Sequence, residues 1–557
     1  MYKSLLVAAC VVFAAAYSVS AQNPVTVIDG GTLIDGNGGP PLPNSVVVID
    51  GARIQAVGAR GTVTYPPGAR IIKADGMTVL PGLIDAHIHS LDFFPQLFLH
   101  FGVTTVYDLS NPTDWIIAQR DALRKGKIKG PRMFVTGEII DGPDPAEDER
   151  RDGYRTQVNT PDEARTLARG LLMRGVDALK VYQNLTPELL RPVVEEAHRA
   201  GTEAVGHSHD AKDAVMAGLK FIEHTTPIAH STIGDPATLK AMDDGRLRNP
   251  EADMNPALFQ PLIDLMLKNG VYYNPTLSRV MINALPKRSQ WNAEAARLIE
   301  QPEYRFIPAA RREAWLRAAR NTRADTDPRT AEGLRKTQEF TRRYAQAGGR
   351  IINGPDSGPS SGPANMAGLA MHVEMEALVD AGLTPMQALQ SSTKWSADLL
   401  NKKDLGTIAA GKIADVILID GNPLADIRAT RAIRTVIMDG KVIDTTLDPN
   451  FQNPLPRPFA EYEMDNREPE VDSLMPKSAR QGGGDLQIEV TGHKFTPHSI
   501  VRLDTTDLAT RFVSESRLTA TVKSSLLKQA GTFTVTVINP GPTGGVSKAG
   551  YLVVTYP

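Results

Sequence analysis

The sequence predicts an α/β protein built around a TIM-type (β/α)8 barrel in residues 80–405. Two observations support this prediction. Between residues 81 and 400, short β-like runs alternate with helical patterns, which is typical of a parallel sheet with helical crossovers. Histidine, lysine and aspartate side chains also recur at or near the ends of these β-like runs, and a parallel barrel gathers the carboxyl ends of its strands on one face.

β-rich segments flank the predicted barrel on both sides. Residues 22–79 contain short β-like runs separated by Asp-Gly turns, and β-like runs return in residues 406–447. Residues 448–472 are rich in proline and charge, as a linker would be. Residues 473–557 alternate short strands with turns, so we expect a second, all-β domain there.

The first 21 residues have the pattern of an export signal. Lys3 precedes a short apolar core, and a small-residue cleavage site ends at Ala21. The apolar core is too short to span a bilayer. Cleavage would remove Cys10, the one cysteine of the chain, which suits a periplasmic or secreted protein. The alternative is a lipoprotein modified at Cys10, because VAAC before that position loosely resembles a lipobox.

Composition narrows the class of partner. The chain has 557 residues, of which 41% are hydrophobic and 22% charged, as in a globular protein. Its net charge of −2 gives no electrostatic argument for binding nucleic acid. Composition therefore gives no indication of a nucleic-acid partner and leaves the oligomeric state open, whereas the small-molecule or dipeptide substrate that we expect follows from the motifs and the resemblance described below.

The run PGLIDAHIHS at residues 81–90 is the strongest chemical signal. His87 and His89 are two positions apart, so on a strand both imidazoles point to the same face. Neutral imidazole is the commonest protein ligand for a catalytic metal. The alternative is two unrelated histidines near a strand end. Similar features recur in four later β-like segments, at Lys180, His207, His224 and Asp356.

These motifs resemble the metal-dependent amidohydrolase superfamily, especially its imidazolonepropionase-like and prolidase-like branch. The matching text runs from residue 25 to 442 and includes VLPGLIDAHIHS, ALKVYQNLTPELL, EEAHRAGTEAVGHSHD, GLKFIEHTT, INGPDSG and LGTIAAGKIADVILIDGNPLADI. The resemblance implies that residues 22–79 and 406–447 form one composite β-sandwich. Residues 473–557 resemble an IPT/TIG immunoglobulin-like domain through TGHKFTPHSIVRL and GTFTVTVINPGP.

The resemblance also implies two divalent metal ions, with zinc as our choice. It assigns His87, His89 and Asp356 to the more buried ion, His207 and His224 to the second, and a carboxylated Lys180 to the bridge between them. Such ions polarise a carbonyl and produce a hydroxide near neutral pH. Asp356 would act as general base on the bridging hydroxide, then as general acid toward the leaving amine.

Several assignments leave alternatives open. His207 and His209 follow the same β-like run, and we expect His207 to be the ligand, with His209 and His230 supporting the site or facing the substrate. Lys180 could instead be an unmodified lysine paired with a carboxylate. Tyr182 shares a strand face with Lys180, so it could donate to an oxyanion or simply pack. Proline stands directly before Asp356, where the family usually has threonine, which puts the surroundings of that carboxylate in doubt.

The arginine-rich residues 278–349 interrupt the strand–helix pattern. They could shape the substrate pocket or form a charged outer helical surface. The function we expect is an exported metal-dependent hydrolase that cleaves an amide or peptide-like C–N bond, as a dipeptidase or prolidase does. The alternatives are a cyclic-amide or lactone hydrolase of the same superfamily, and a non-catalytic surface-binding protein.

Overall fold

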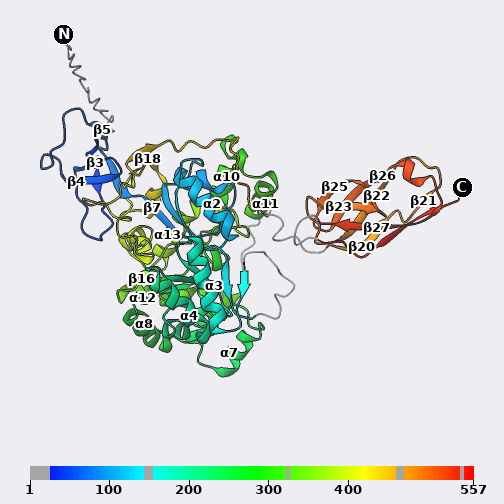
Figure 1. The fold of residues 1–557 in the computed structure, drawn as a ribbon, viewed down its shortest axis with the longest axis horizontal. Coiled ribbons are helices and arrows are strands. Elements are labelled where there is room, and N and C mark those ends of the chain that lie inside the picture. Colours follow the sequence, from blue (N-terminus) through cyan, green and yellow to red (C-terminus); the bar gives the residue numbers. More distant parts are fainter. Residues whose placement is uncertain (1–24, 144–154, 321–326, 459–468, 540–544, 557) are drawn as a thin grey trace, which may run out of the picture.

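A computed structural model describes residues 25–143, 155–320, 327–458, 469–539 and 545–556. The predicted export signal, with Cys10 and Ala21, lies outside these residues. Figure 1 shows a large α/β region and, beyond it, the strands β20 to β28 as a body of their own. Among the described helices, none combines the length and apolar character needed to cross a bilayer.

The central strands form three parallel sheets (arcs), and within each arc every strand runs in the same direction as the strands it pairs with. The first arc contains β7 (Leu83–Ile88), β8 (Val103–Asp108) and β9 (Arg132–Val135). The second contains β11 (Arg155–Gln157), β10 (Ile139–Asp141), β12 (Leu179–Val181) and β13 (Ala204–Gly206). The third contains β14 (Phe221–Glu223), β15 (Tyr272–Asn274) and β16 (Arg350–Ile351).

Backbone hydrogen bonds join the end of the third arc to the first. The amide of Ala86 donates to Asn353, the amide of Asp356 donates to His87, and the amide of His89 donates to Ser357. The strand pairing of the described residues does not run continuously through all three arcs. The parallel α/β architecture is therefore established, whereas closure into one eight-stranded barrel remains a prediction.

Helices follow most of these strands along the chain, and Figure 1 shows them around the arcs. They are α1 (Phe94–His100), α2 (Thr113–Arg124), α3 (Pro161–Arg174), α4 (Pro187–Arg199), α5 (Ala211–Met216), α6 (Thr226–Thr232), α7 (Pro236–Asp243), α8 (Phe259–Lys268), α9 (Leu277–Val280), α10 (Arg288–Ile299), α11 (Ala309–Arg320), α12 (Pro328–Gln346), α13 (Leu369–Asp380), α14 (Pro385–Ser391) and α15 (Lys394–Leu399). Local signals set their ends: Thr160 caps α3 by accepting from the amide of Glu163, and Gly175 ends that helix in the left-handed conformation.

The arginine-rich segment 278–349 forms α9 to α12, apart from the residues outside the described ranges. Trp315 on α11 is buried, and its indole donates to the carbonyl of Ser361 at 2.7 Å. Its ring also meets Phe93, which follows β7, with the ring centroids 6.2 Å apart. The inserted helices therefore pack onto loops that follow β7 and β16, in addition to presenting charge on their outer faces.

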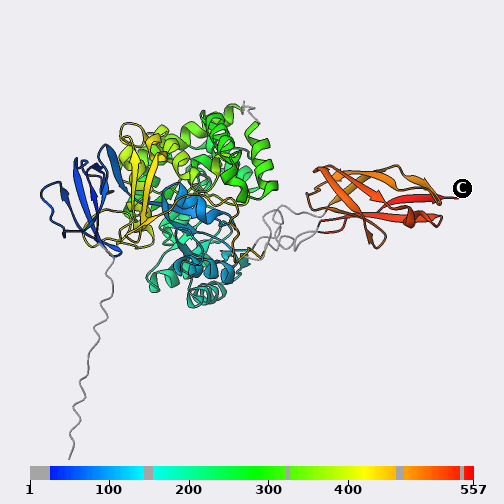
Figure 2. The same cartoon turned by 90° about the horizontal axis from the view of Figure 1, so that it is seen from above.

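Two further sheets flank the arcs, and one of them combines strands from both ends of the α/β region, which Figure 2 draws in blue and yellow. One sheet has the order β4 (Arg53–Ala59), β3 (Ser45–Asp50), β1 (Thr26–Asp29), β5 (Arg70–Lys73). The other has the order β19 (Lys441–Ile443), β18 (Ile433–Met438), β17 (Val416–Asp420), β6 (Met77–Pro81), β2 (Thr32–Leu33). Ile28, Val79, Leu418 and Ile437 belong to one buried core, so the two ends of the region are packed together.

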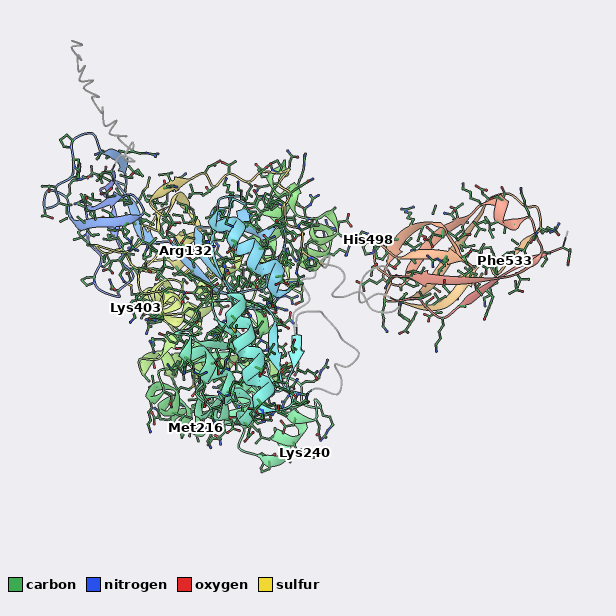
Figure 3. The ribbon with its side chains drawn as sticks, in the orientation of Figure 1. Arg132, Met216, Lys240, Lys403, His498 and Phe533 are labelled. Atoms are coloured by element: carbon green, nitrogen blue, oxygen red, sulfur yellow. The ribbon has the colours of Figure 1, made fainter. Side chains whose placement is uncertain are left out.

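Two polar side chains, Arg132 and His372, join segments that are far apart in the chain. Arg132 on β9, labelled in Figure 3, pairs with the buried Asp415 and, at 2.5 Å, with Asp439. His372 on α13 is fully buried, and its Nε2 donates to the carbonyl of Phe101 at 3.0 Å. Burial lowers the pKa of His372 to about 3, so the ring is neutral at physiological pH.

The C-terminal region is all-β, as the alternating pattern predicts. Its strands are β20 (Glu470–Met475), β21 (Ser478–Arg480), β22 (Leu486–His493), β23 (Ile500–Leu503), β24 (Thr506–Asp507), β25 (Ala509–Ser514), β26 (Arg517–Val522), β27 (Gly531–Ile538) and β28 (Gly550–Thr555). They form two sheets around a separate core that includes Ile488, Val501 and Leu552. β20 begins inside the stretch predicted as a linker. The likeness to IPT/TIG domains remains a prediction.

Candidate metal centre

Six side chains predicted as ligands gather where the parallel strands end. Nε2 of His87 lies 3.3 Å from Nε2 of His89 and 3.5 Å from Oδ1 of Asp356. Nε2 of His207 lies 2.7 Å from Nε2 of His224. The rings of His87 and His224 are tilted against each other with centroids 5.5 Å apart, which joins the two groups. Lys180 reaches them through a seventh residue.

That seventh residue is Glu223, which the sequence reasoning missed. Its Oε2 lies 2.5 Å from Nζ of Lys180 and 3.6 Å from Nε2 of His207. Its Oε1 lies 3.1 Å from Nδ1 of His87, without the alignment of a hydrogen bond. Burial raises the pKa of Glu223, although the Lys180 ammonium acts in the opposite direction. The available signal was an acid inside the apolar run FIE, where a charge is costly without a partner.

Backbone breaks at the strand ends make this convergence possible. Neighbouring residues of a regular strand point to opposite faces, so Glu223 and His224 could not both face the cluster. His224 has a φ of 65°, which interrupts the strand at that point, and Asp356 has a φ of 58°. Gly206 precedes His207 and has a φ of 140°, and an added Cβ there would lie 2.2 Å from the carbonyl oxygen of Val181. The sequence therefore needs glycine at that position.

Hydrogen bonds fix which nitrogen of His224 is free. The hydroxyl of Thr276 donates to the carbonyl of Pro275 at 2.8 Å, so its oxygen accepts from Nδ1–H of His224 at 2.6 Å. Nε2 of His224 is then the unprotonated nitrogen, the form that binds a metal. Burial lowers the pKa of His224 to about 4 and holds the pKa values of His87 and His207 well below their usual range. The rings are neutral near pH 7 and offer lone pairs.

Hydrogen bonding also indicates which nitrogen of His89 is free to bind a metal. Its Nδ1 lies 3.3 Å from the carbonyl oxygen of Ser110, which can only accept, so Nδ1 carries the proton in the neutral ring. Nε2 then faces Oδ1 of Asp356 at 3.2 Å, and both atoms are acceptors. A cation between them would replace this repulsion with attraction. Two groups of three residues each have one ligand atom per residue within 4.8 Å of the others. They are His87, His224 and Asp356, and His207, Glu223 and His224. The donor set therefore fits divalent metal ions.

Arg279 at the start of the inserted helices is a second residue that the sequence did not single out. Its Nε lies 3.7 Å from Oδ2 of Asp356, and its Nη2 donates to Ser360 at 2.7 Å. The buried carboxylate of Glu374 accepts from the amides of Leu277 and Ser278, which fixes the chain just before Arg279. The carboxylate of Asp356 thus has histidines on one oxygen and a guanidinium near the other.

The other predicted site residues lie beside the cluster. The Tyr182 ring stacks on His207 with centroids 4.3 Å apart, and the Arg155 guanidinium lies 4.3 Å from the Tyr182 centroid on its face. His207, and not His209, contacts His224. His209 and His230 meet each other at 4.2 Å and pair with carboxylates outside the cluster. Pro355 accepts from Asn365 through its carbonyl at 2.8 Å, so this loop has its own support.

Comparison with known proteins shows which proteins this chain is similar to. The sequence pattern of the amidohydrolase family matches residues 96–443. An imidazolonepropionase from Anaeromyxobacter sp. (strain K) is 25% identical over 437 residues, 72% of this chain and 91% of that protein. An N-acyl-D-aspartate deacylase from Alcaligenes xylosoxydans xylosoxydans is 38% identical over 85 residues, so the chain spans only 16% of its length. The solved structure of a Xaa-Pro dipeptidase with bound methionine aligns with a TM-score of 0.54 and 25% identity, over 75% of this chain and 100% of that one.

Proposed function

The chain belongs to the amidohydrolase family, and from this premise we propose that it is a metal-dependent hydrolase of C–N bonds in small, peptide-like molecules. The observation that carries the proposal is the set of facing acceptor atoms in the cluster. Nε2 of His89 and Oδ1 of Asp356 lie 3.2 Å apart in a largely buried site, and Nε2 of His224 is left unprotonated nearby. Acceptors brought together in this way are stable when they share cations.

The ligand assignment divides the cluster into two groups. His87, His89 and Asp356 would hold one divalent ion, and His207 and His224 the other, with zinc as the proposed metal and a carboxylated Lys180 as the proposed bridge. When bound, such ions polarise the scissile carbonyl and lower the pKa of water. The Lys180–Glu223 pair, at 2.5 Å, is the arrangement of the unmodified lysine.

The chain's own groups then handle protons and orientation. Asp356 is positioned to take a proton from the attacking water and to deliver it to the leaving nitrogen, since one carboxylate can perform both transfers in sequence. Arg279 lies on the opposite oxygen of Asp356 and keeps that carboxylate oriented. Tyr182, which stacks on His207, is proposed to donate its hydroxyl proton to the oxyanion. The variant Tyr182→Phe tests this role, because it keeps the stacking ring and removes the donor.

The likeness to a Xaa-Pro dipeptidase over its full length supports a dipeptidase of prolidase type. The likeness to an imidazolonepropionase over 72% of the chain supports a second candidate, hydrolysis of a cyclic amide. A screen of the zinc-loaded protein against Xaa-Pro and other dipeptides, N-acyl amino acids and cyclic amides separates the two. Turnover of dipeptides supports the first candidate, and turnover of cyclic amides alone supports the second.

A metal measurement tests the proposal independently of the substrate. We expect zinc at His87, His89, His207, His224 and Asp356, loss of activity with a chelator, and recovery on adding zinc back. His87→Asn should abolish turnover and lower the zinc content. His198→Ala is the matched control, because His198 is an exposed histidine paired with Glu203 at 2.9 Å. A His87→Asn protein with wild-type zinc content and turnover would refute the proposal.

The proposal also covers location and architecture. We propose export with cleavage near Ala21, a closed barrel for residues 80–405, and an IPT/TIG-like fold for residues 473–557. Cell fractionation with N-terminal sequencing tests the first point: a start at Gln22 supports cleavage there, whereas a lipid-modified Cys10 would replace it with a lipoprotein.

A further inference from the structure

A second group of metal-binding side chains lies outside the cluster at the strand ends. His209 follows β13 in the chain, His230 lies on α6, and Asp243 is the last residue of α7. Oδ1 of Asp243 lies 3.1 Å from Nε2 of His209 and 3.1 Å from Nε2 of His230. One ligand atom from each of the three residues lies within 4.8 Å of the others. Figure 3 labels Lys240 on α7, at the edge of the α/β region.

The spacing of these three atoms suits a tetrahedral ion. Zinc binds imidazole nitrogen at roughly 2.0–2.1 Å, which places two ligand atoms of a tetrahedron about 3.3 Å apart. Two of the three separations here are 3.1 Å. An ion can therefore enter with small movements of the side chains. His209 and Asp243 are half exposed, so the ion would be reachable from solvent and keep a free position for water.

A second carboxylate orients one of the ligands. Oδ2 of Asp210 accepts from Nδ1–H of His230 at 2.8 Å and from the hydroxyl of Ser231 at 2.9 Å. Oδ1 of Asp210 accepts from the amide of Asp213 at 2.8 Å, so the carboxylate itself is held at the start of α5. With the proton on Nδ1, the other nitrogen of His230 is directed at Asp243. A histidine oriented by a carboxylate in this way is the usual support of a metal-bound imidazole.

The surrounding charge also favours a cation. The carboxylates of Asp210 and Asp243 lie on either side of the His230 ring, at 2.8 Å from Nδ1 and 3.1 Å from Nε2. Positive charge is thus stabilised between the two carboxylates. Two imidazole nitrogens select a borderline transition metal rather than calcium or magnesium, which prefer oxygen ligands.

We propose that His209, His230 and Asp243 form a third metal site, for a divalent transition-metal ion such as zinc, nickel or cobalt. The site is separate from the proposed catalytic centre and does not depend on the proposed function. An ion here would link the loop after β13 to the C-terminal parts of α6 and α7. That loop also carries His207, so the third ion would stiffen the chain next to the catalytic cluster.

Zinc counting on the full-length protein tests this site. At micromolar free zinc, we expect the wild-type protein to hold one more equivalent than either His230→Ala or Asp243→Asn. His198→Ala, which removes a histidine paired with a single carboxylate, should match the wild type. Hydrogen exchange provides a second readout, since zinc should slow exchange in residues 236–243 of the wild type and not of His230→Ala.

Equal zinc content in the wild type, His230→Ala and Asp243→Asn would overturn the proposal. An exchange rate in residues 236–243 that zinc leaves unchanged in the wild type would also overturn it. Any ions at the catalytic cluster would be present in all of these proteins and would cancel in the comparison. The difference of one equivalent can therefore be measured whether or not the catalytic proposal holds.

Discussion

Replacing Thr276 with valine should weaken metal binding at His224 by about 10- to 100-fold. Thr276 is fully buried, and its hydroxyl oxygen accepts from Nδ1–H of His224 at 2.6 Å. Valine has nearly the same shape, and it is β-branched like threonine, so the positive φ of 48° at this position is no harder to adopt. The substitution therefore removes the acceptor for His224 and also the hydrogen bond that the hydroxyl donates to the Pro275 carbonyl.

The magnitude follows from what His224 loses. A buried N–H left without an acceptor costs about 1–3 kcal/mol. Since about 1.4 kcal/mol corresponds to a factor of ten in affinity, the loss is roughly one to two powers of ten. The ring could avoid the unpaired donor by moving its proton to Nε2, but that nitrogen is the one that must be free to bind the ion. Whether the N–H stays unpaired or the proton moves, the bond between Nε2 of His224 and the ion is weakened.

A zinc competition titration against a chelator of known affinity measures this effect at neutral pH. Thr276→Ser is the matched control, because it keeps the hydroxyl and should bind zinc nearly as the wild type does. Circular dichroism and denaturant unfolding establish that both variants fold. The reasoning fails if Thr276→Val retains wild-type zinc affinity, or if Thr276→Ser loses as much as Thr276→Val.

Other buried contacts lead to further expected outcomes. In chelator-treated protein, Lys180→Met or Glu223→Gln alone should lower the free energy of unfolding by about 3–5 kcal/mol, because each leaves a buried partner unpaired, and the double variant should recover part of the loss in urea unfolding. Arg132→Met should lower the free energy of unfolding by a similar amount, about 3 kcal/mol, because it leaves the buried Asp415 without its charged partner. Zinc affinity should not change. His372 has a pKa of about 3 when folded and about 6.5 when unfolded. Only the unfolded chain takes up this proton between those values. The stability due to His372 is therefore complete above pH ~6.5 and falls by up to ~1.4 kcal/mol per pH unit as the pH drops toward 3, and His372→Gln should flatten this slope in unfolding curves.

The parts of the site that depend on local pattern could be predicted from the sequence. His87 and His89 are two apart at a strand end, so their common direction follows from strand geometry alone. His207 and His224 each directly follow a short strand in the structure, at β13 and β14. Asp356 stands a few residues beyond β16 in the same way. A parallel sheet brings such positions together whatever the exact strand lengths, so this prediction does not depend on where each strand begins and ends.

The parts that depend on tertiary geometry could not be predicted in this way. Glu223 reaches the cluster because the strand is interrupted at His224, which has a positive φ. The periodicity of a sequence does not predict a positive φ at a histidine. The partners of His209 and His230 are likewise set by where α7 ends, since Asp243 contacts both from a separate helix. In the composite sheet, the pairing of β6 with β17 joins segments more than 300 residues apart. The resemblance to a family implied that pairing, whereas the residue pattern alone did not.

Charge balance connects the missed carboxylate to the state of Lys180. Ionised Glu223 and Asp356 with an ammonium on Lys180 carry a net charge of −1, and the Arg279 guanidinium beside Asp356 brings the sum to zero, so the unmodified lysine suits the cluster without metal. Two divalent ions would add four positive charges to a buried site, and burial penalises such an excess. Addition of CO2 to the Lys180 amine, with release of two protons from the starting ammonium, would replace a cation with a carbamate anion and offset part of that excess. The same side chain therefore suits both states: as an ammonium it pairs with Glu223, and as the proposed carbamate it would bridge the two ions, with Glu223 then facing positive ions instead of an ammonium.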